Sequence, residues 1–152
     1  MKKCATIFGV VVLAITMALP AMAHDVKKDV GEAKYDKAVA NLLLGVGDQG
    51  SNSGLRRSAI YMLGELEAQE AVIPLMSVLR SCPDEKARIA AAWALCRIGD
   101  GRGTYAVKQS VRFDESPKLK MHCAWYYNLY VREGTFAFIP SENAPTQIAE
   151  VR

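Results

Sequence analysis

The stretch RIAAAWALCRIGD, residues 88–100, is rich in alanine and ends at a Gly-Asp pair. Its central part, Ile89 to Cys96, is apolar on every side of a helix, whereas a helix on the surface of a protein keeps one polar face. Small residues such as Ala91 let neighbouring helices approach closely. The stretch therefore predicts a helix packed between other helices, with Trp93 and Leu95 filling the space around it.

Two further stretches repeat this pattern at an interval of 32 residues, RRSAIYMLGELEA from Arg56 and KMHCAWYYNLYVREG from Lys120. A second helical pattern follows each of the first two stretches at the same interval, with Leu75 matching Val107. The repeat unit is thus a helical hairpin, and residues 35–47 supply the second helix of an incomplete first unit. The columns that carry the repeat are Arg56/Arg88/Lys120, Ala59/Ala91/Cys123, Tyr61/Trp93/Trp125 and Leu63/Leu95/Tyr127.

Residues at the expected helix ends agree with this division. Asp84 suits the N-cap of the helix that carries Arg88, and Gly99 suits the left-handed conformation that ends that helix. Ser116 and Pro117 form a cap followed by a proline at the first helical position. Pro74 is tolerated in the first turn of a helix, where its missing N–H is not needed.

The N-terminus has the layout of a secretory signal peptide: two lysines, an apolar run, Pro20 and then an A-x-A site at Ala21–Ala23. We expect cleavage after residue 23, so that residues 1–23 are the signal and the protein is periplasmic or secreted. The sequence then divides into a helical repeat domain at 24–133 and a C-terminal tail at 134–152. We expect this tail to be partly packed, with Phe136 and Phe138 covering the last apolar face, and mobile beyond Pro140.

Charge and cysteine content limit the functional classes. The formal net charge of +3 falls close to zero once the signal with its lysines is removed, which gives no support to nucleic-acid binding. We expect no stable membrane insertion after cleavage, because no second apolar run is long enough to span a bilayer. Cys96 and Cys123 read as buried apolar residues, Cys82 as the more reactive thiol, and their disulfide state is open.

The repeated stretches resemble HEAT repeats, in particular the short type named after phycobilisome lyases. The matching strings are LRRSAIYMLGELEAQEAVIPLMSVL, ARIAAAWALCRIGDGRGTYAVKQSV and a degenerate LKMHCAWYYNLY. The resemblance covers residues 52–133 and implies an all-α solenoid whose second helices line a concave face and bind other proteins. The repeated His-Glu pairs of the hydroxylases with this fold are absent, so we expect no enzyme activity and no cofactor.

The second helices of the hairpins carry a candidate partner-binding face. Its positions lie at i, i+3 and i+7 within each helix and match one another at the 32-residue interval. We expect a mildly basic surface with an aromatic ring and a methionine for adaptable contacts. Its six residues are Ile73, Met76, Arg80, Tyr105, Lys108 and Arg112.

Two alternative functions stay open. His24, as the mature N-terminal residue, and His122, the other histidine, offer a copper site, although two ligands on a repeat scaffold are a thin set. The aromatic C-terminal end offers a homodimer interface through Phe136 and Phe138. The glycine-rich GDGRG at residues 99–103 lacks the lysine of a phosphate-binding loop and the alternating acids of a calcium loop, so we interpret it as a hairpin turn.

Overall fold

The computed structural model describes residues 27–28, 31–47, 52–141 and 144–151, and the predicted signal peptide and His24 lie outside these residues. Helices dominate the described chain, and a short β-hairpin follows them. The helices in chain order are α2 (Glu32–Gly47), α3 (Ser53–Glu65), the 3₁₀ turn η1 (Gln69–Ala71), α4 (Val72–Ser81), α5 (Glu85–Ile98), α6 (Gly101–Phe113), α7 (Pro117–Tyr126) and the π-helical turn η2 (Tyr127–Val131).

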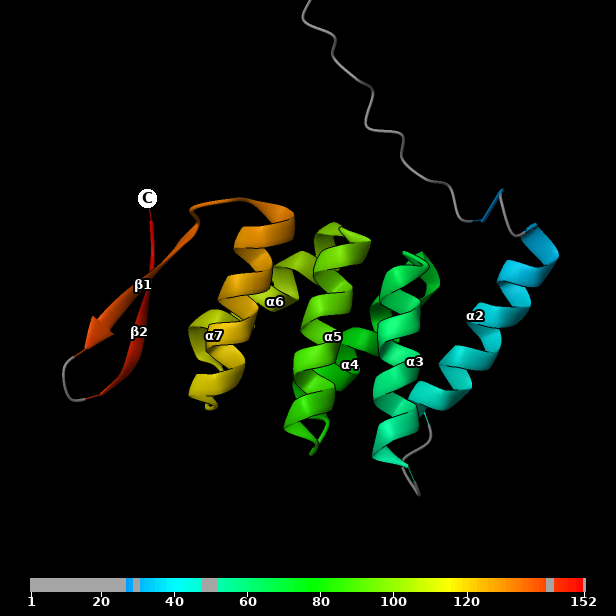
Figure 1. The fold of residues 1–152 in the computed structure, drawn as a ribbon, viewed down its shortest axis with the longest axis horizontal. Helices are drawn as coiled ribbons and strands as arrows, with labels where there is room; N and C mark the ends of the chain where they lie inside the picture. The colour runs from blue at the N-terminus through cyan, green and yellow to red at the C-terminus, as the bar shows by residue number, and fades with distance from the viewer. Residues whose placement is uncertain (1–26, 29–30, 48–51, 142–143, 152) are drawn as a thin grey trace, which may run out of the picture.

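These helices form two layers. The first helices of the hairpins, α3, α5 and α7, lie side by side, and α4 and α6 lie behind them (Figure 1). Helix α2 packs against α3 at one end of the row, where it takes the place of the second helix of an incomplete unit. No described helix is long and apolar enough to cross a membrane. The all-α solenoid predicted from the repeat is confirmed.

Helix α5 is the centre of the core. Its alanines from Ala90 to Ala92 and Ala94 are fully buried between α3, α4 and α7, and so is Leu95. The other fully buried large side chains come from the neighbouring helices: Ile60, Leu63, Val72, Leu75, Leu79, Val107, Leu119 and Cys123, each at 2% exposure or less. The repeating small and aliphatic residues therefore form one shared interior, as the sequence predicts.

The helix ends are built by the residues that the sequence indicates. The Asp84 carboxylate accepts a hydrogen bond from the Lys86 N–H at 3.0 Å, and Ser116 Oγ accepts one from the Leu119 N–H at 3.1 Å. Gly99 ends α5 with a φ of +73°. Asp100 caps α6 through the N–H groups of Arg102 and Gly103, so the GDGRG segment is a turn between helices.

The C-terminal tail contains secondary structure that the sequence analysis does not predict. It forms two antiparallel strands, β1 (Phe136–Ser141) and β2 (Ala144–Glu150), beside α7 at the end of the helical row (Figure 1). Phe136 is 4% exposed and contacts the Tyr127 ring edge-on at 5.5 Å, whereas Phe138 is 39% exposed. One of the two phenylalanines thus covers the last apolar face, and a strand pair replaces the missing helix.

Candidate functional site

A groove between α4 and α6 is the candidate functional site. It encloses about 330 Å³ and brings together three of the six residues that the sequence predicts, Met76, Arg80 and Tyr105. The remaining lining residues are Leu79, Ala106, Gln109, Ser110, Phe113 and Asp114. We call this site the α4–α6 groove.

Large aromatic side chains at this groove are exposed to solvent. Tyr105 is 63% exposed and Phe113 is 75% exposed. The two residues lie about two turns apart on α6. Leu79 beneath them is buried, and Arg80 adds an exposed cation that has no ion pair within the described residues. Aromatic and arginine side chains around a small depression are typical of the residues that dominate protein interfaces.

The other three predicted residues lie elsewhere. Ile73 is 57% exposed on α4 and does not line the groove. Lys108 and Arg112 lie on the flank of α6 beneath β2, where Glu150 binds both: Lys108 Nζ lies 2.6 Å from Glu150 Oε1, and Arg112 Nε donates to Oε2 at 3.0 Å. The six residues therefore do not all line one groove, and the single Glu150 carboxylate offsets part of the positive charge that the sequence predicts for this face.

Lys108 and Arg112 also change the pKa of Glu150. Hydrogen bonds from Lys108 and then from Arg112 hold the pKa of the Glu150 carboxyl below its usual range. Glu150 therefore remains ionised and stays an acceptor at neutral pH.

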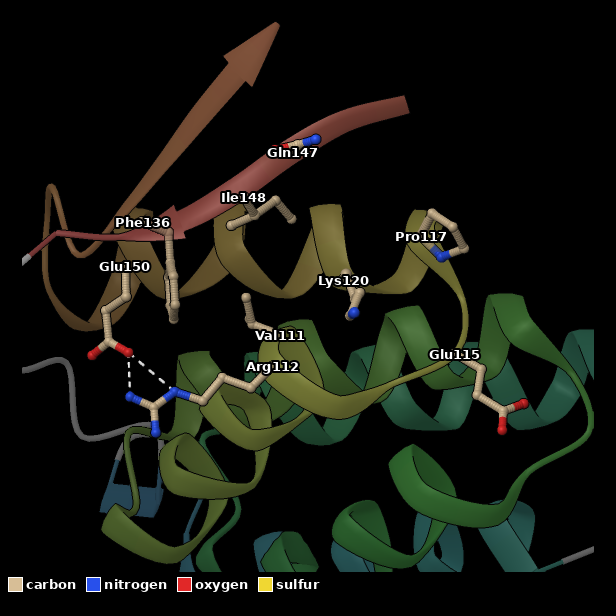
Figure 2. Close-up of a pocket in the computed structure, with 9 residues that line it drawn as sticks. All are labelled: Val111, Arg112, Glu115, Pro117, Lys120, Phe136, Gln147, Ile148 and Glu150. Carbon is tan, nitrogen blue, oxygen red and sulfur yellow. Dashed lines mark hydrogen bonds and ion pairs between the residues drawn. The ribbon is translucent and has the colours of Figure 1, made fainter. Parts of the chain in front are cut away.

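A cavity of about 540 Å³ lies between the hairpin and the helices (Figure 2). Ile148 and Phe136 approach it from the hairpin, and Val111 approaches from α6. Polar residues line the rest of its wall: Arg112, Glu115, Lys120, Gln147 and Glu150, together with Pro117. The hairpin thus rests on the helices through a small number of side chains, with open space beneath it.

Sequence reasoning placed Trp93 inside the core, and the structure puts it at the edge. Its ring is half-buried, lies 5.1 Å from the Tyr61 ring, and its Nε1 donates to the Tyr130 hydroxyl at 3.3 Å. The Arg97 guanidinium lies 5.8 Å from the Trp93 ring centroid. An indole that keeps a polar partner at the surface is a common arrangement for tryptophan.

The aromatic column of the repeat therefore marks a second exposed surface, on the layer opposite the groove. Tyr61 and Trp125, which share the column with Trp93, are both exposed. Trp125 stacks on Tyr126 at 5.4 Å, and Tyr126 stacks on His122 at 5.8 Å. The 32-residue spacing identified these positions, but it did not reveal that they point outward.

His122 belongs to no group of three or more His, Cys, Asp or Glu side chains that could hold a metal ion within the described residues, and His24 lies outside them. Its Nδ1 is buried and has no hydrogen-bond partner among the residues that the structure describes. Burial lowers its pKa, Lys118 lowers it further, and Glu85 opposes both.

The three described cysteines are free thiols. Burial raises the pKa of Cys96 to about 12 and raises that of Cys123 as well, so both stay protonated. Cys82 is half-buried and accepts a hydrogen bond from Arg56 at 3.4 Å. This agrees with the interpretation of Cys96 and Cys123 as packing residues.

Comparison with known proteins supports the repeat architecture. The family model described as HEAT repeats matches residues 20–96, about half of the chain. The model described as the PBS lyase HEAT-like repeat matches residues 87–111, which span most of the helical pair α5 and α6. No curated protein matches the chain.

Proposed function

Because the chain belongs to the HEAT-repeat family, we propose that it is a protein-binding scaffold and that its partner occupies the α4–α6 groove. The observation that carries this proposal is the pair of exposed aromatic rings, Tyr105 and Phe113, beside the exposed Arg80. Leaving such rings in water is unfavourable, so a partner that covers them gains apolar burial and a cation contact together.

The scale of the groove favours a side chain or a short segment of a protein over a small-molecule substrate. Its volume of about 330 Å³ is at the lower end for ligand pockets, and it is a depression on a helical surface. A helix or loop that inserts one apolar residue between α4 and α6 fits this space. We accordingly propose a binding role without catalysis.

The site of action that we propose is the periplasm or the extracellular space, on the strength of the signal-like layout of residues 1–23. N-terminal sequencing of the protein purified from its native envelope tests this. We expect the first residue to be His24, and an intact Met1 would contradict export by this route.

Site-specific photo-crosslinking tests the binding role. A photoreactive phenylalanine at position 105 or 113 is expected to yield one discrete heteromeric product in the native envelope, because both positions border the groove. The matched control is position 44, where Leu44 on α2 is 75% exposed and does not line the groove. The same product from all three positions, or none from 105 and 113, would contradict a groove partner.

Variants then show whether the groove residues supply affinity. We expect Tyr105→Ser with Phe113→Ser to weaken the captured complex by at least about ten-fold, the usual effect of removing an interface hot spot. Both side chains are exposed, so the melting temperature should stay near that of the wild type. The control variant Leu44→Ser removes a similar exposed side chain and should bind as the wild type does.

A further inference from the structure

Lys108 and Arg112 form a carboxylate-binding pair that the chain fills with its own residue. Both donate to Glu150, the last residue of β2. Two cations on one carboxylate make a charge-assisted contact with defined geometry. Figure 2 shows Arg112 extended from α6 toward the end of the strand.

The matching positions of the preceding unit carry no strand above them, and of the two only Arg80 is exposed, since Met76 is half-buried. Met76 and Arg80 on α4 correspond to Lys108 and Arg112 at the 32-residue interval. Arg80 is exposed and has no ion pair in the described part of the chain. The hairpin therefore covers one repeat and leaves the adjoining repeat open.

Strand β2 pairs with β1 along its length, but it contacts the helices through few side chains. Ile148 and Glu150 lie two residues apart, so both point from β2 toward the helices, as alternation in a strand requires. A cavity of about 540 Å³ lies beside these residues, between the hairpin and α6 and α7. A two-stranded hairpin is only marginally stable by itself. Its β1 strand is anchored by the buried Phe136, whose backbone N–H and carbonyl both bond the Asn128 side chain, whereas β2 contacts the helices through Ile148 and Glu150.

We propose that β2 is a displaceable occupant of this site, and that an extended segment of the protein partner replaces it. The segment carries an aliphatic residue two positions before a carboxylate, as Ile148 precedes Glu150, and it pairs with β1 in the register that β2 uses, Phe138 opposite the aliphatic residue and Phe136 opposite the acid. This inference rests on the proposed function, since it names the chemistry of the partner.

Proximity makes the exchange selective. A tethered strand has an effective concentration near the millimolar range, so a free acidic segment does not displace it easily. A partner already bound in the α4–α6 groove is held on α6, the same helix that carries Lys108 and Arg112, and then competes on similar terms. The hairpin therefore rejects acidic segments that lack a groove contact.

A peptide of β2 itself is the probe. The labelled nonapeptide APTQIAEVR, residues 144–152, is titrated against the full chain by fluorescence anisotropy. We expect Ile148→Ser with Glu150→Gln to bind it at least about ten-fold more tightly than the wild type, because the internal competitor is weakened. Replacing the glutamate of the peptide by glutamine should weaken binding to that variant by about ten-fold.

Two controls make the outcome decisive. Adding Lys108→Gln and Arg112→Gln to the double variant should abolish the gain. Glu65→Gln removes a carboxylate that pairs with Arg97 at 3.3 Å on the other layer, and it should bind the peptide as the wild type does. A double variant that binds no better than the wild type, or a gain that survives the loss of both cations, would overturn the proposal.

A second measurement applies if the double variant fails to fold. Glu150→Gln alone should speed hydrogen exchange of the β2 amides by about ten-fold and leave α5 unchanged, and unaltered exchange in β2 would overturn the proposal. Adding Tyr105→Ser and Phe113→Ser to the double variant separates the two hypotheses. Peptide binding should persist in this combined variant. Its loss would show that the peptide binds in the α4–α6 groove, which would contradict this inference and support the groove as a binding site.

Discussion

Gly64 shows how closely two neighbouring first helices approach. A Cβ atom at this position would lie 2.6 Å from Cζ3 of Trp93 and 2.9 Å from the backbone Cα of Ala94. Because the second contact is with backbone, α3 and α5 would have to move apart. We expect Gly64→Ala to lower the free energy of unfolding by about 1–3 kcal/mol, measured by urea denaturation.

The control is Gly101→Ala in the first turn of α6, where a Cβ would meet nothing within 4 Å. This change should be neutral or stabilise the protein by up to about 1 kcal/mol, because it restricts the unfolded chain. Equal midpoints for both variants would show that α3 and α5 are not in close contact at Gly64.

The burial of single residues in α5 could be predicted from the sequence only in part. The alanines of α5 and Leu95 are buried, as expected, because small and aliphatic side chains have no polar group to keep at the surface. Trp93 packs between α3 and α5 as predicted, but it is only partly buried. Its size and its N–H let the ring lie across Gly64 and reach Tyr130 at the rim, and the spacing of residues along a helix does not distinguish that placement from burial.

At the scale of the elements, one guanidinium joins three helices. Arg88 on α5 donates through Nε to the carbonyl of Leu79 on α4 at 2.8 Å and pairs with Asp114, which caps the end of α6. The Arg88 and Asp114 side chains are only 19% and 11% exposed. Arg88→Met leaves Asp114 nearly buried without its partner, and we expect a loss of about 3 kcal/mol in chemical denaturation.

Arg102→Met is the matched control. Arg102 pairs with Asp100 at 3.1 Å, but its side chain is 64% exposed, and exposed pairs contribute less than about 1 kcal/mol. If the two variants unfold at the same denaturant concentration, the burial of the Arg88 pair does not stabilise the stack.

Helix boundaries could be predicted because caps are local. Asp84, Ser116 and Pro117 each act within a few residues of their own position, so the sequence alone indicates them. The C-terminal hairpin was missed because only a short alternation, TFAFI from Thr135, hints at a strand. Its stability comes from contacts with α6 and α7, which a local pattern does not contain.

At the scale of the whole molecule, the hairpin ends the stack and reshapes the candidate site. A row of helical pairs needs its last apolar face covered, and Phe136 supplies that cover where a helix would otherwise lie. Helical spacing correctly grouped Met76, Arg80 and Tyr105 near one groove. It could not separate Lys108 and Arg112 from them, because the carboxylate that binds these cations comes from a strand some forty residues away.

The contacts of Glu150 predict that low pH detaches β2 from α6. The pKa of Glu150 is lowered in the folded protein, so its contribution to stability is present above the unfolded pKa of about 4.3 and is lost as pH falls through the folded value. In NMR spectra recorded at decreasing pH, we expect the β2 amide signals of Ile148 and Ala149 to move toward random-coil positions below about pH 4, while those of Ala91 in α5 stay in place. In Glu150→Gln the same β2 signals should not change over this range, because the titrating group that links the strand to Lys108 and Arg112 has been removed. Signals from β2 that move equally in both proteins would show that some other acid holds the hairpin against α6.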